Sequence, residues 1–275
     1  MIPKIIHQIW FQGENNIPKT YPNYSHTWKK LNPLYEYMFW DQQSIETLII
    51  NYYPELYNKY KSYPEIIQKI DMAKYIILNH FGGIYVDLDL EALKPVDKLI
   101  SSHSIIFAKY GVNYFEKIVA YGSIFGDVLE NGFIASSKKN PFWEHCYKIL
   151  LNENINRKLF ESHFKYIFRT IGPGLLTNAY NSYKDKDKIY LLDGNYIDPM
   201  PCCDYEWNNC SQQDCRKLFP DAYAFHHCGS RHDTHSWVNN TEKTVGYFLC
   251  RFKYYLIVLL FIVIITCIWY WFKIK

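Results

Sequence analysis

The sequence predicts an α/β domain with a mostly parallel sheet, because segments of strand periodicity alternate with a segment of helical periodicity. Strand patterns occur at residues 4–10, 35–41 and 84–91, and a helical pattern occupies residues 65–81. Parallel strands need long crossover connections, and a helix between two strands supplies one. No repeat or low-complexity linker interrupts the chain, so residues 1–250 are predicted to form one domain.

Each element has a local justification. The strand KIIHQIW ends before a polar loop that contains Gly13, and the strand YEYMFWD follows the turn residues Asn32 and Pro33. The helix follows Pro64 and ends at Gly82 and Gly83, because glycine adopts the left-handed conformation at low cost. Its apolar residues share one face at helical spacing: Ile66, Ile67, Ile70, Ala73, Ile77, Leu78 and Phe81.

The composition indicates a folded chain without an electrostatic signal for nucleic acid. With 275 residues, of which 49% are hydrophobic, the chain can bury a substantial core. Its 30 basic and 27 acidic residues leave a formal net charge of +3. Such a balance does not favour a polyanionic partner, so we expect no nucleic-acid binding.

The C-terminal residues 254–272 predict a single transmembrane helix. The run YYLIVLLFIVIITCIWYWF contains no charged residue and is close to the ~20 residues that span a hydrocarbon core. Aromatic and basic residues flank both of its ends, so the positive-inside rule gives no orientation. The N-terminus lacks the features of a signal peptide. We therefore expect a single-pass membrane protein whose simplest topology holds the domain in the cytosol by its tail.

The cysteines leave the compartment open. Five of the eight cysteines cluster late in the chain, at positions 202, 203, 210, 215 and 228. Their spacing lacks the paired C-x2-C of a structural zinc site, and disulfides in a lumenal domain are the other interpretation. The sequence does not decide whether these cysteines form disulfide bonds.

Three carboxylates, Asp87, Asp89 and Glu91, occupy alternate positions of the predicted strand IYVDLDLE and therefore share one of its faces. Asp87 and Asp89 would lie roughly 6–7 Å apart along that strand and repel each other unless a cation lies between them. Hard oxygen ligands suit Mg²⁺ or Mn²⁺, with the oxygens of a diphosphate completing the shell. The position near the carboxyl end of a strand, where open α/β sheets bind ligands, favours this interpretation.

Two other interpretations of the same residues stay open. The first is a solvent-facing edge strand with no specific role for its charges. The second is a phosphatase in which Asp87 attacks phosphorus, although Glu91 occupies the position where such enzymes carry threonine.

Four motifs together resemble the D-x-D glycosyltransferases of family 32, which include fungal inositol phosphoceramide mannosyltransferases and initiating α-1,6-mannosyltransferases. The motifs are IPKIIHQIW at residues 2–10, IDMAKY with GGIYVDLD between residues 70 and 89, NGFIASSKKNPFW at 131–143 and GPGLLT at 172–177. They span most of the chain before the apolar tail. The resemblance implies a retaining nucleotide-sugar transferase of the GT-A fold, a Rossmann-like domain that binds a divalent metal.

The resemblance also implies roles for individual residues. The donor-binding residues would be His7, Gln8, Trp10, Asp71, Lys74, Gly83, Tyr85 and Asp87. Trp10 would stack on the nucleotide base, and the catalytic residues would be Asp71, Asp89 and Asn131. The metal, Mn²⁺ or Mg²⁺, would be held by Asp87, Asp89 and His226, with His227, His232 and His235 as the other histidine candidates.

The function expected from the resemblance is transfer of a hexose to a membrane lipid or a glycan. GDP-mannose is the favoured donor, a UDP-sugar is the other candidate, and an inositol phosphoceramide is the most specific acceptor. Two alternatives are carried with it: the phosphatase that uses Asp87, and a non-catalytic glycan-binding protein on a transferase fold.

Overall fold

A computed structural model gives the structure of the chain. It describes residues 1–21, 23–110, 127–200 and 212–228, and in the tail residues 241, 244, 252, 255, 258, 259 and 261–271.

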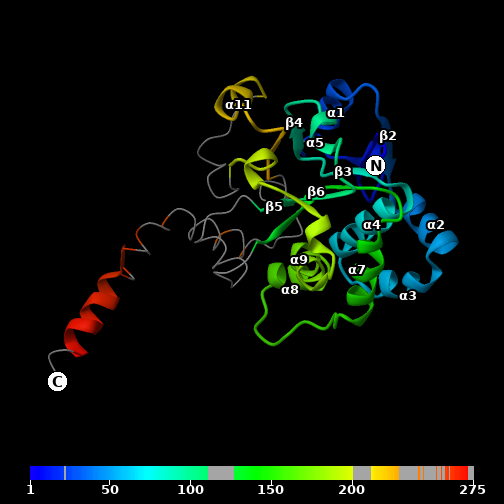
Figure 1. Cartoon of the computed structure of the whole chain (residues 1–275). Helices are drawn as coiled ribbons and strands as arrows, with labels where there is room; N and C mark the ends of the chain where they lie inside the picture. The colour runs from blue at the N-terminus through cyan, green and yellow to red at the C-terminus, as the bar shows by residue number, and fades with distance from the viewer. Residues whose placement is uncertain are drawn as a thin grey trace.

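A mixed six-stranded sheet forms the centre of the described domain (Figure 1). The order β2-β1-β3-β6-β5-β7 pairs β1 in parallel with β2 and β3, and β5 in parallel with β7, whereas β6 runs antiparallel to both β3 and β5. A separate antiparallel pair is formed by β4 and β8. The predicted α/β class is confirmed. The strands are β1 (Ile5–Ile9), β2 (Glu36–Trp40), β3 (Gly83–Val86), β4 (Leu90–Ala92), β5 (Ile105–Lys109), β6 (Leu129–Ser136), β7 (Tyr190–Leu192) and β8 (Ala224–His226).

Helices cover both faces of the sheet. One core joins α2, α3, α4, α7 and α9 to the sheet, and a second lies against α1, α5 and the β4–β8 pair (Figure 1). Along β3 the side chains alternate between these cores, with Tyr85 in the first and Ile84 and Val86 in the second. The helices are α1 (Ser25–Leu31), α2 (Gln42–Tyr52), α3 (Pro54–Ser62), α4 (Ile66–Phe81), α5 (Asp97–Ile100), α7 (Pro141–Asn152), α8 (His163–Thr170), α9 (Pro173–Ser182) and α11 (Gln212–Leu218), with short 3-10 turns η1 (Glu14–Asn16), η2 (Lys186–Lys188) and η3 (Gly194–Tyr196).

The predicted helix is confirmed as α4, and its two terminal glycines are required by their surroundings. Gly82 and Gly83 have φ angles of 70° and 102°. A Cβ on Gly83 would lie 2.6 Å from the carbonyl oxygen of Ile5 and 3.0 Å from Nε2 of His7. Only glycine therefore allows the chain to turn from α4 directly into β3 against β1.

The predicted strand over residues 84–91 is wrong in its second half. β3 ends at Val86, and a turn follows in which the amide of Leu90 donates to the carbonyl of Asp87 at 3.1 Å. The amide of Tyr24 donates to the carbonyl of Leu88 at 2.8 Å and holds this turn. β4 then pairs with β8 outside the large sheet. Asp87 and Asp89 are therefore not neighbours on one strand face.

The predicted transmembrane helix over residues 254–272 is also wrong, and with it the single-pass localisation. Within the part of the tail that the structure describes, the longest continuous helical stretch covers residues 261–271. That is shorter than the ~20 residues a crossing helix needs. Among all described residues, no helix is both long and apolar enough to span a bilayer.

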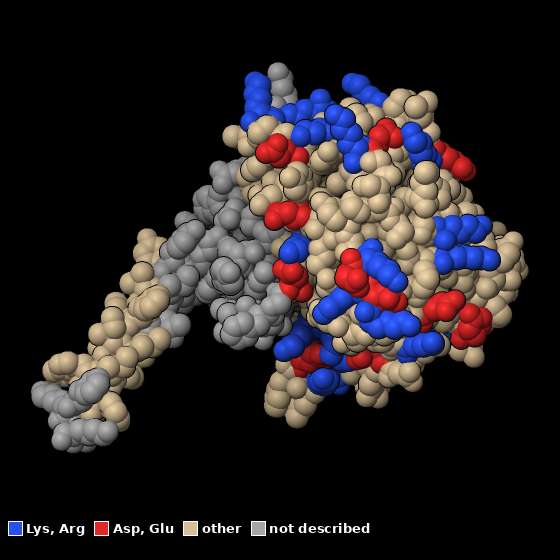
Figure 2. Space-filling view, in the orientation of Figure 1, with Lys and Arg blue, Asp and Glu red and all other residues tan. Residues whose placement is uncertain are grey.

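Charges of both signs are interspersed on the face of the domain shown in Figure 2. This mixture follows from the near balance of basic and acidic residues in the sequence. Neighbouring charges form pairs such as Lys4 with Asp97, whose nitrogen and oxygen lie 2.7 Å apart.

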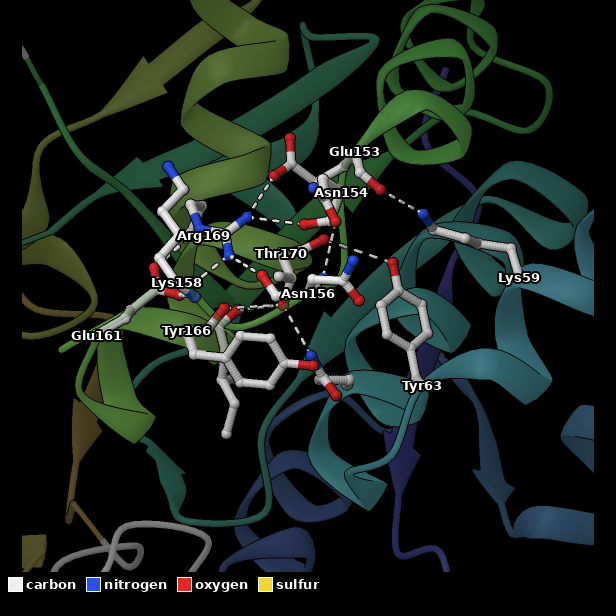
Figure 3. A network of polar contacts seen from close by, with 12 residues as sticks. Lys59, Tyr63, Glu153, Asn154, Asn156, Lys158, Glu161, Tyr166, Arg169 and Thr170 are labelled. Atoms are coloured by element: carbon white, nitrogen blue, oxygen red, sulfur yellow. Dashed lines mark hydrogen bonds and ion pairs between the residues drawn. The ribbon is translucent and has the colours of Figure 1, made fainter.

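A polar network centred on Arg169 fixes the loop between α7 and α8 (Figure 3). Its guanidinium donates to both carboxylate oxygens of Glu161 at 2.9 and 3.0 Å, and to Oε1 of Glu153 at 2.6 Å. Two loop carbonyls, of Asn154 and Asn156, accept from the same group. The five N–H groups of Arg169 thus all donate to this loop and its ends. Arginine presents these donors in a planar fork, a geometry that lysine does not offer.

The end of α8 is in turn attached to α4. Gln68 donates to the hydroxyl of Thr170 at 2.8 Å, and the hydroxyl of Tyr75 donates to the carbonyl of Ile171 at 2.8 Å. These contacts bring Gly172 so close to α4 that a Cβ on it would lie 3.4 Å from Oδ2 of Asp71. The α8–α9 junction therefore forms one wall around Asp71.

We predict that Glu161→Gln lowers the free energy of unfolding by about 2 kcal/mol at pH 7, because it removes a charge-assisted, bidentate pair. Hydrogen bonds from Arg169 lower the pKa of Glu161 to about 2, below its ordinary 4.5. The carboxylate therefore stabilises the fold above pH 4.5, and this contribution is lost as the pH falls toward 2. Urea unfolding of both proteins from pH 7 to pH 2 checks this; a difference that stays constant over the range contradicts it.

Candidate active site

The candidate site lies where the parallel strands β1 and β3 end. Trp10 follows β1 directly, and Asp87 follows β3 directly. In parallel sheets, the carboxyl ends of strands are where ligands bind. The ends of the first and second predicted motifs therefore lie at the same edge of the sheet.

A buried ammonium group organises the first half of the site. Nζ of Lys74, on α4, lies 3.0 Å from Oδ1 of Asp71 and 3.2 Å from Oδ1 of Asp87. It also lies 4.8 Å from the centre of the Tyr85 ring. Burial alone would lower the pKa of Lys74, but the carboxylates of Asp87 and Asp71 raise it above its ordinary value. Lys74 is therefore a fixed positive charge between two carboxylates.

Asp87 keeps one side of its carboxylate available. The hydroxyl of Tyr85 donates to Oδ1 at 2.5 Å, and Lys74 contacts the same oxygen. Within the described residues, the hydrogen bonds and ion pairs of the Asp87 side chain all involve Oδ1. The side chain of Asp87 is 28% exposed. The second oxygen, Oδ2, is the one that a ligand can use.

An irregularity in β6 brings Asn131 to this cluster. Along β5 the pairing partner changes from Ile134, opposite Phe107, to Glu130, opposite Ala108, so three residues of β6 bulge out of the ladder. Nδ2 of Asn131 donates to Oδ1 of Asp71 at 3.0 Å. The bulge thus aims the amide of Asn131 across the site at α4.

Gly132, in the same bulge, lies between two carboxylates. A Cβ on Gly132 would lie 2.8 Å from Oδ2 of Asp87 and 2.8 Å from Oε1 of Glu130. Its amide donates to Oε1 of Glu130 at 2.7 Å. Burial raises the pKa of Glu130 to about 7, and its other oxygen, Oε2, is buried without a hydrogen-bond partner. A side chain at position 132 would separate groups that the site holds close together.

The second half of the site is centred on His226. Its Nε2 lies 3.3 Å from Oδ2 of Asp89, and its Nδ1 lies 3.9 Å from Oδ2 of Asp198. Burial alone would lower the pKa of His226, but the carboxylates of Asp89 and Asp198 raise it well above its ordinary value. The pairing of Leu90 with His226 between β4 and β8 brings Asp89 and the histidine together.

Glu91 and His227 form a separate pair. Nε2 of His227 lies 2.8 Å from Oε2 of Glu91, with both side chains buried. The ring of His227 also stacks on Tyr24, with centroids 4.1 Å apart. This pair explains the third carboxylate of the motif as a link between β4 and β8. Of the other histidine candidates, His232 and His235 lie outside the described residues.

The three predicted donor-binding residues in and directly after β1 occupy different environments. His7 is fully buried, accepts from Nε1 of Trp40 at 3.2 Å and contacts the carbonyl of Gly82 at 2.8 Å; burial lowers its pKa to about 4. Gln8 donates to the carbonyl of Asp87 at 3.3 Å. Trp10 is partly exposed and contacts the ring of Tyr21, with centroids 4.8 Å apart. Both nitrogens of His7 are thus engaged within the protein, so it supports the site from the core.

The donor set fits a divalent metal, although the predicted ligands are not assembled around one point. Across the residues that the structure describes, no three His, Cys, Asp or Glu side chains are arranged to hold a metal ion. Asp87 is engaged by Lys74, and Asp89 by His226. Both oxygens of Asp198, Nδ1 of His226 and Oε2 of Glu130 are nevertheless buried without hydrogen-bond partners. Carboxylates in excess beside an imidazole suit Mn²⁺ or Mg²⁺.

Glu130 and Asp198 were not among the predicted site residues. The tripeptide Glu130-Asn131-Gly132 within an apolar strand is a signal for a bulge, because Asn-Gly disrupts strand pairing, and this signal points to Glu130. Asp198 lies in an irregular segment without a motif, so no local pattern marks it. The question of disulfides in the cysteine cluster is answered for two of its members, because Cys215 and Cys228 are each disulfide-bonded.

We predict that Lys74→Met lowers the free energy of unfolding by about 3–5 kcal/mol, because it leaves Asp71 and Asp87 without their buried counterion. The matched control is Lys188→Met, which removes a 3.0 Å pair with Asp185 whose lysine is exposed. An exposed pair contributes little to stability, because water screens it. Equal losses for the two variants in urea unfolding contradict the role given to Lys74.

Comparisons with known proteins place these residues in a family. A family described as "Glycosyltransferase sugar-binding region containing DXD motif" matches residues 18–106. An uncharacterized glycosyltransferase of Acanthamoeba polyphaga mimivirus is 32% identical over 215 residues, covering 76% of this chain and 77% of that protein. Inositol phosphoceramide mannosyltransferase 1 of Schizosaccharomyces pombe is 28% identical over 186 residues, covering 66% of this chain and 52% of that protein.

Other similarities are shorter or more distant. The initiation-specific alpha-1,6-mannosyltransferase of Candida albicans is 38% identical over 112 residues, covering 39% of this chain and 29% of that protein. The solved structure of mouse xyloside xylosyltransferase 1 aligns with a TM-score of 0.44 at 14% identity, over 82% of this chain and 97% of that one. The chain spans about half the length of the inositol phosphoceramide mannosyltransferase it matches.

The similarity to the mimivirus protein extends over more than three quarters of both chains, and the family match includes Asp71, Lys74, Asp87 and Asp89. The family expected from the four motifs is confirmed, and so is the prediction that the chain is a glycosyltransferase. The chain belongs to the glycosyltransferases whose sugar-binding region contains the DXD motif.

Proposed function

We propose that this glycosyltransferase transfers a mannosyl residue from GDP-mannose to a lipid or glycan acceptor, such as an inositol phosphoceramide, with Mn²⁺ or Mg²⁺. The observation that carries the proposal is the buried cluster of Asp71, Lys74, Asn131 and Asp87 at the end of β3. The choice of mannose rests on relatives whose names describe mannosyl transfer.

Different residues of the site would bind different parts of the nucleotide-sugar donor. Trp10, partly exposed at the end of β1, offers a ring face to the nucleotide base. Asp71 and Asn131 offer an acceptor and a donor to sugar hydroxyls, and Lys74 fixes both in place. Preorganised polar groups of this kind need little rearrangement when a sugar binds.

Asp87, Asp89 and His226 would hold the metal, with Oδ2 of Asp87 facing the site. The metal, when bound, supplies positive charge that stabilises the negative charge developing on the departing diphosphate. Lys74 is engaged by two carboxylates and therefore cannot replace that charge.

For the stereochemistry, we propose retention by attack on the same face of the sugar as the leaving group. The bond from the anomeric carbon to the phosphate oxygen breaks, the bond to the acceptor oxygen forms, and a phosphate oxygen takes the acceptor proton. Asp71 is ill suited to be a covalent nucleophile, because Lys74 and Asn131 both engage its carboxylate. A trapped glycosyl-enzyme on an aspartate or glutamate contradicts this step.

A donor screen tests the proposed function. We expect the rate of hydrolysis or transfer with GDP-mannose and Mn²⁺ to exceed the rate with UDP-sugars. Asp87→Asn and Asp89→Asn should each reduce the rate about 10²–10³-fold, because each substitution weakens electrostatic stabilisation of the leaving group. Asp185→Asn, at an exposed surface pair, is the control and should match the wild type. The proposal fails if no nucleotide sugar is turned over, or if the two site variants match the control.

A further inference from the structure

Asp198 is a buried carboxylate whose role neither the sequence motifs nor the family assignment explains. It follows η3 and is 1% exposed. Both of its carboxylate oxygens are buried, and within the described residues neither has a hydrogen-bond partner. A buried carboxylate without hydrogen bonds is costly, so its place in the fold calls for an explanation.

The backbone of this segment fixes where the side chain lies. The amide of Asp198 donates to the carbonyl of Gly194 at 2.7 Å, and the preceding residue, Ile197, is fully buried in the second core. The amide of Tyr223, just before β8, donates to the carbonyl of Tyr196 at 2.7 Å. The segment that carries Asp198 is therefore attached directly to the strand that carries His226.

The two side chains complement each other. Nδ1 of His226 is also buried without a hydrogen-bond partner, and it lies 3.9 Å from Oδ2 of Asp198. The other ring nitrogen, Nε2, lies 3.3 Å from Oδ2 of Asp89. One ring nitrogen thus faces each carboxylate. A modest approach of the two side chains would convert the 3.9 Å contact into a hydrogen bond.

We propose that Asp198 is a positioning residue for the metal centre: it accepts a hydrogen bond from Nδ1–H of His226 and thereby leaves the lone pair of Nε2 for a divalent cation that Asp89 also binds. Which nitrogen of a histidine binds a metal is set by the hydrogen bond that the other nitrogen makes. The inference rests on the proposed function only in taking His226 and Asp89 as metal ligands.

Comparison with His227 shows why the arrangement at His226 is different. Nε2 of His227 already contacts Glu91 at 2.8 Å, which makes a closed pair with no orphan oxygen on Glu91. Around His226, by contrast, three carboxyl groups lie near one imidazole: those of Asp89, Asp198 and Glu130. Two of them, on Asp198 and Glu130, have buried oxygens without hydrogen-bond partners. The excess of acidic groups fits a place where a cation is added.

The test is a double-mutant cycle on Mn²⁺ binding to the full chain, measured by electron paramagnetic resonance of free Mn²⁺ without donor. Asp198→Leu removes the acceptor at similar volume and should raise the Kd for Mn²⁺ about 10–100-fold. Asp198→Asn keeps an oxygen acceptor but no charge and should have a smaller effect. Because Asp198 acts through the histidine, Asp198→Leu should add little to the loss already caused by His226→Gln.

The control is Asp193→Asn, in the same segment, where the exposed carboxylate accepts from the amide of Asn195 at 2.9 Å and faces no histidine. This variant should bind Mn²⁺ as the wild type does. If Asp198→Leu fails to fold, as judged by circular dichroism, the cycle is run with Asp198→Asn.

The outcomes separate the inference from the proposed function. The role of Asp198 is overturned if His226→Gln weakens Mn²⁺ binding but both Asp198 variants bind Mn²⁺ with full affinity. It is also overturned if the losses caused by Asp198→Leu and His226→Gln are additive. In both cases the metal site itself remains supported. Wild-type affinity in His226→Gln and Asp89→Asn overturns the metal site itself, and with it this inference.

Discussion

The buried ammonium of Lys74 between Asp71 and Asp87 is the interaction on which the site depends. It joins α4 to the end of β3, and through Asp71 it is connected to Asn131 in β6. Without it, the buried carboxylate of Asp71 and the partly exposed carboxylate of Asp87 would lie near each other without a counterion, which is costly in a low dielectric. The carboxylate of Asp71 also lies against Gly172, so the α8–α9 junction, which a hydrogen bond between Gln68 and Thr170 holds to α4, closes around it. The fold thus fixes a set of polar groups before any ligand arrives.

The turn after β3 gives the two aspartates of the D-x-D motif different tasks. Asp87 remains with the Lys74 cluster, while Asp89 is carried into the β4–β8 pair and meets His226. Gly132 allows Asp87 and Glu130 to approach where these halves meet. In the half that contains Asp71 and Asp87, the ammonium group of Lys74 neutralises the carboxylates, and this half is suited to binding the hydroxyl groups of a sugar. The other half retains unpartnered acidic oxygens and is suited to an added cation.

The sequence predicted those features that depend on local patterns. Helix α4, the two glycines after it and the alternation of Ile84, Tyr85 and Val86 follow from helical period, backbone freedom and strand period. The break after Val86 did not follow, because Leu88 and Leu90 continue the alternation although they are buried outside the large sheet. Asp198 meets His226 only through tertiary packing, and the apolar composition of the tail did not determine the length of its described helix. Contacts between distant segments decided the break after Val86 and the meeting of Asp198 with His226.

We propose that the two halves of the site converge on one divalent cation. Anomalous X-ray diffraction at the manganese edge, from crystals of the full chain grown with Mn²⁺ and GDP, locates that cation. We expect one strong peak within bonding distance of Asp89 and His226, with Oδ2 of Asp87 directed toward it. A peak bound elsewhere, or nucleotide bound at the end of β1 and β3 with no metal beside it, would show that the two halves do not share a cation.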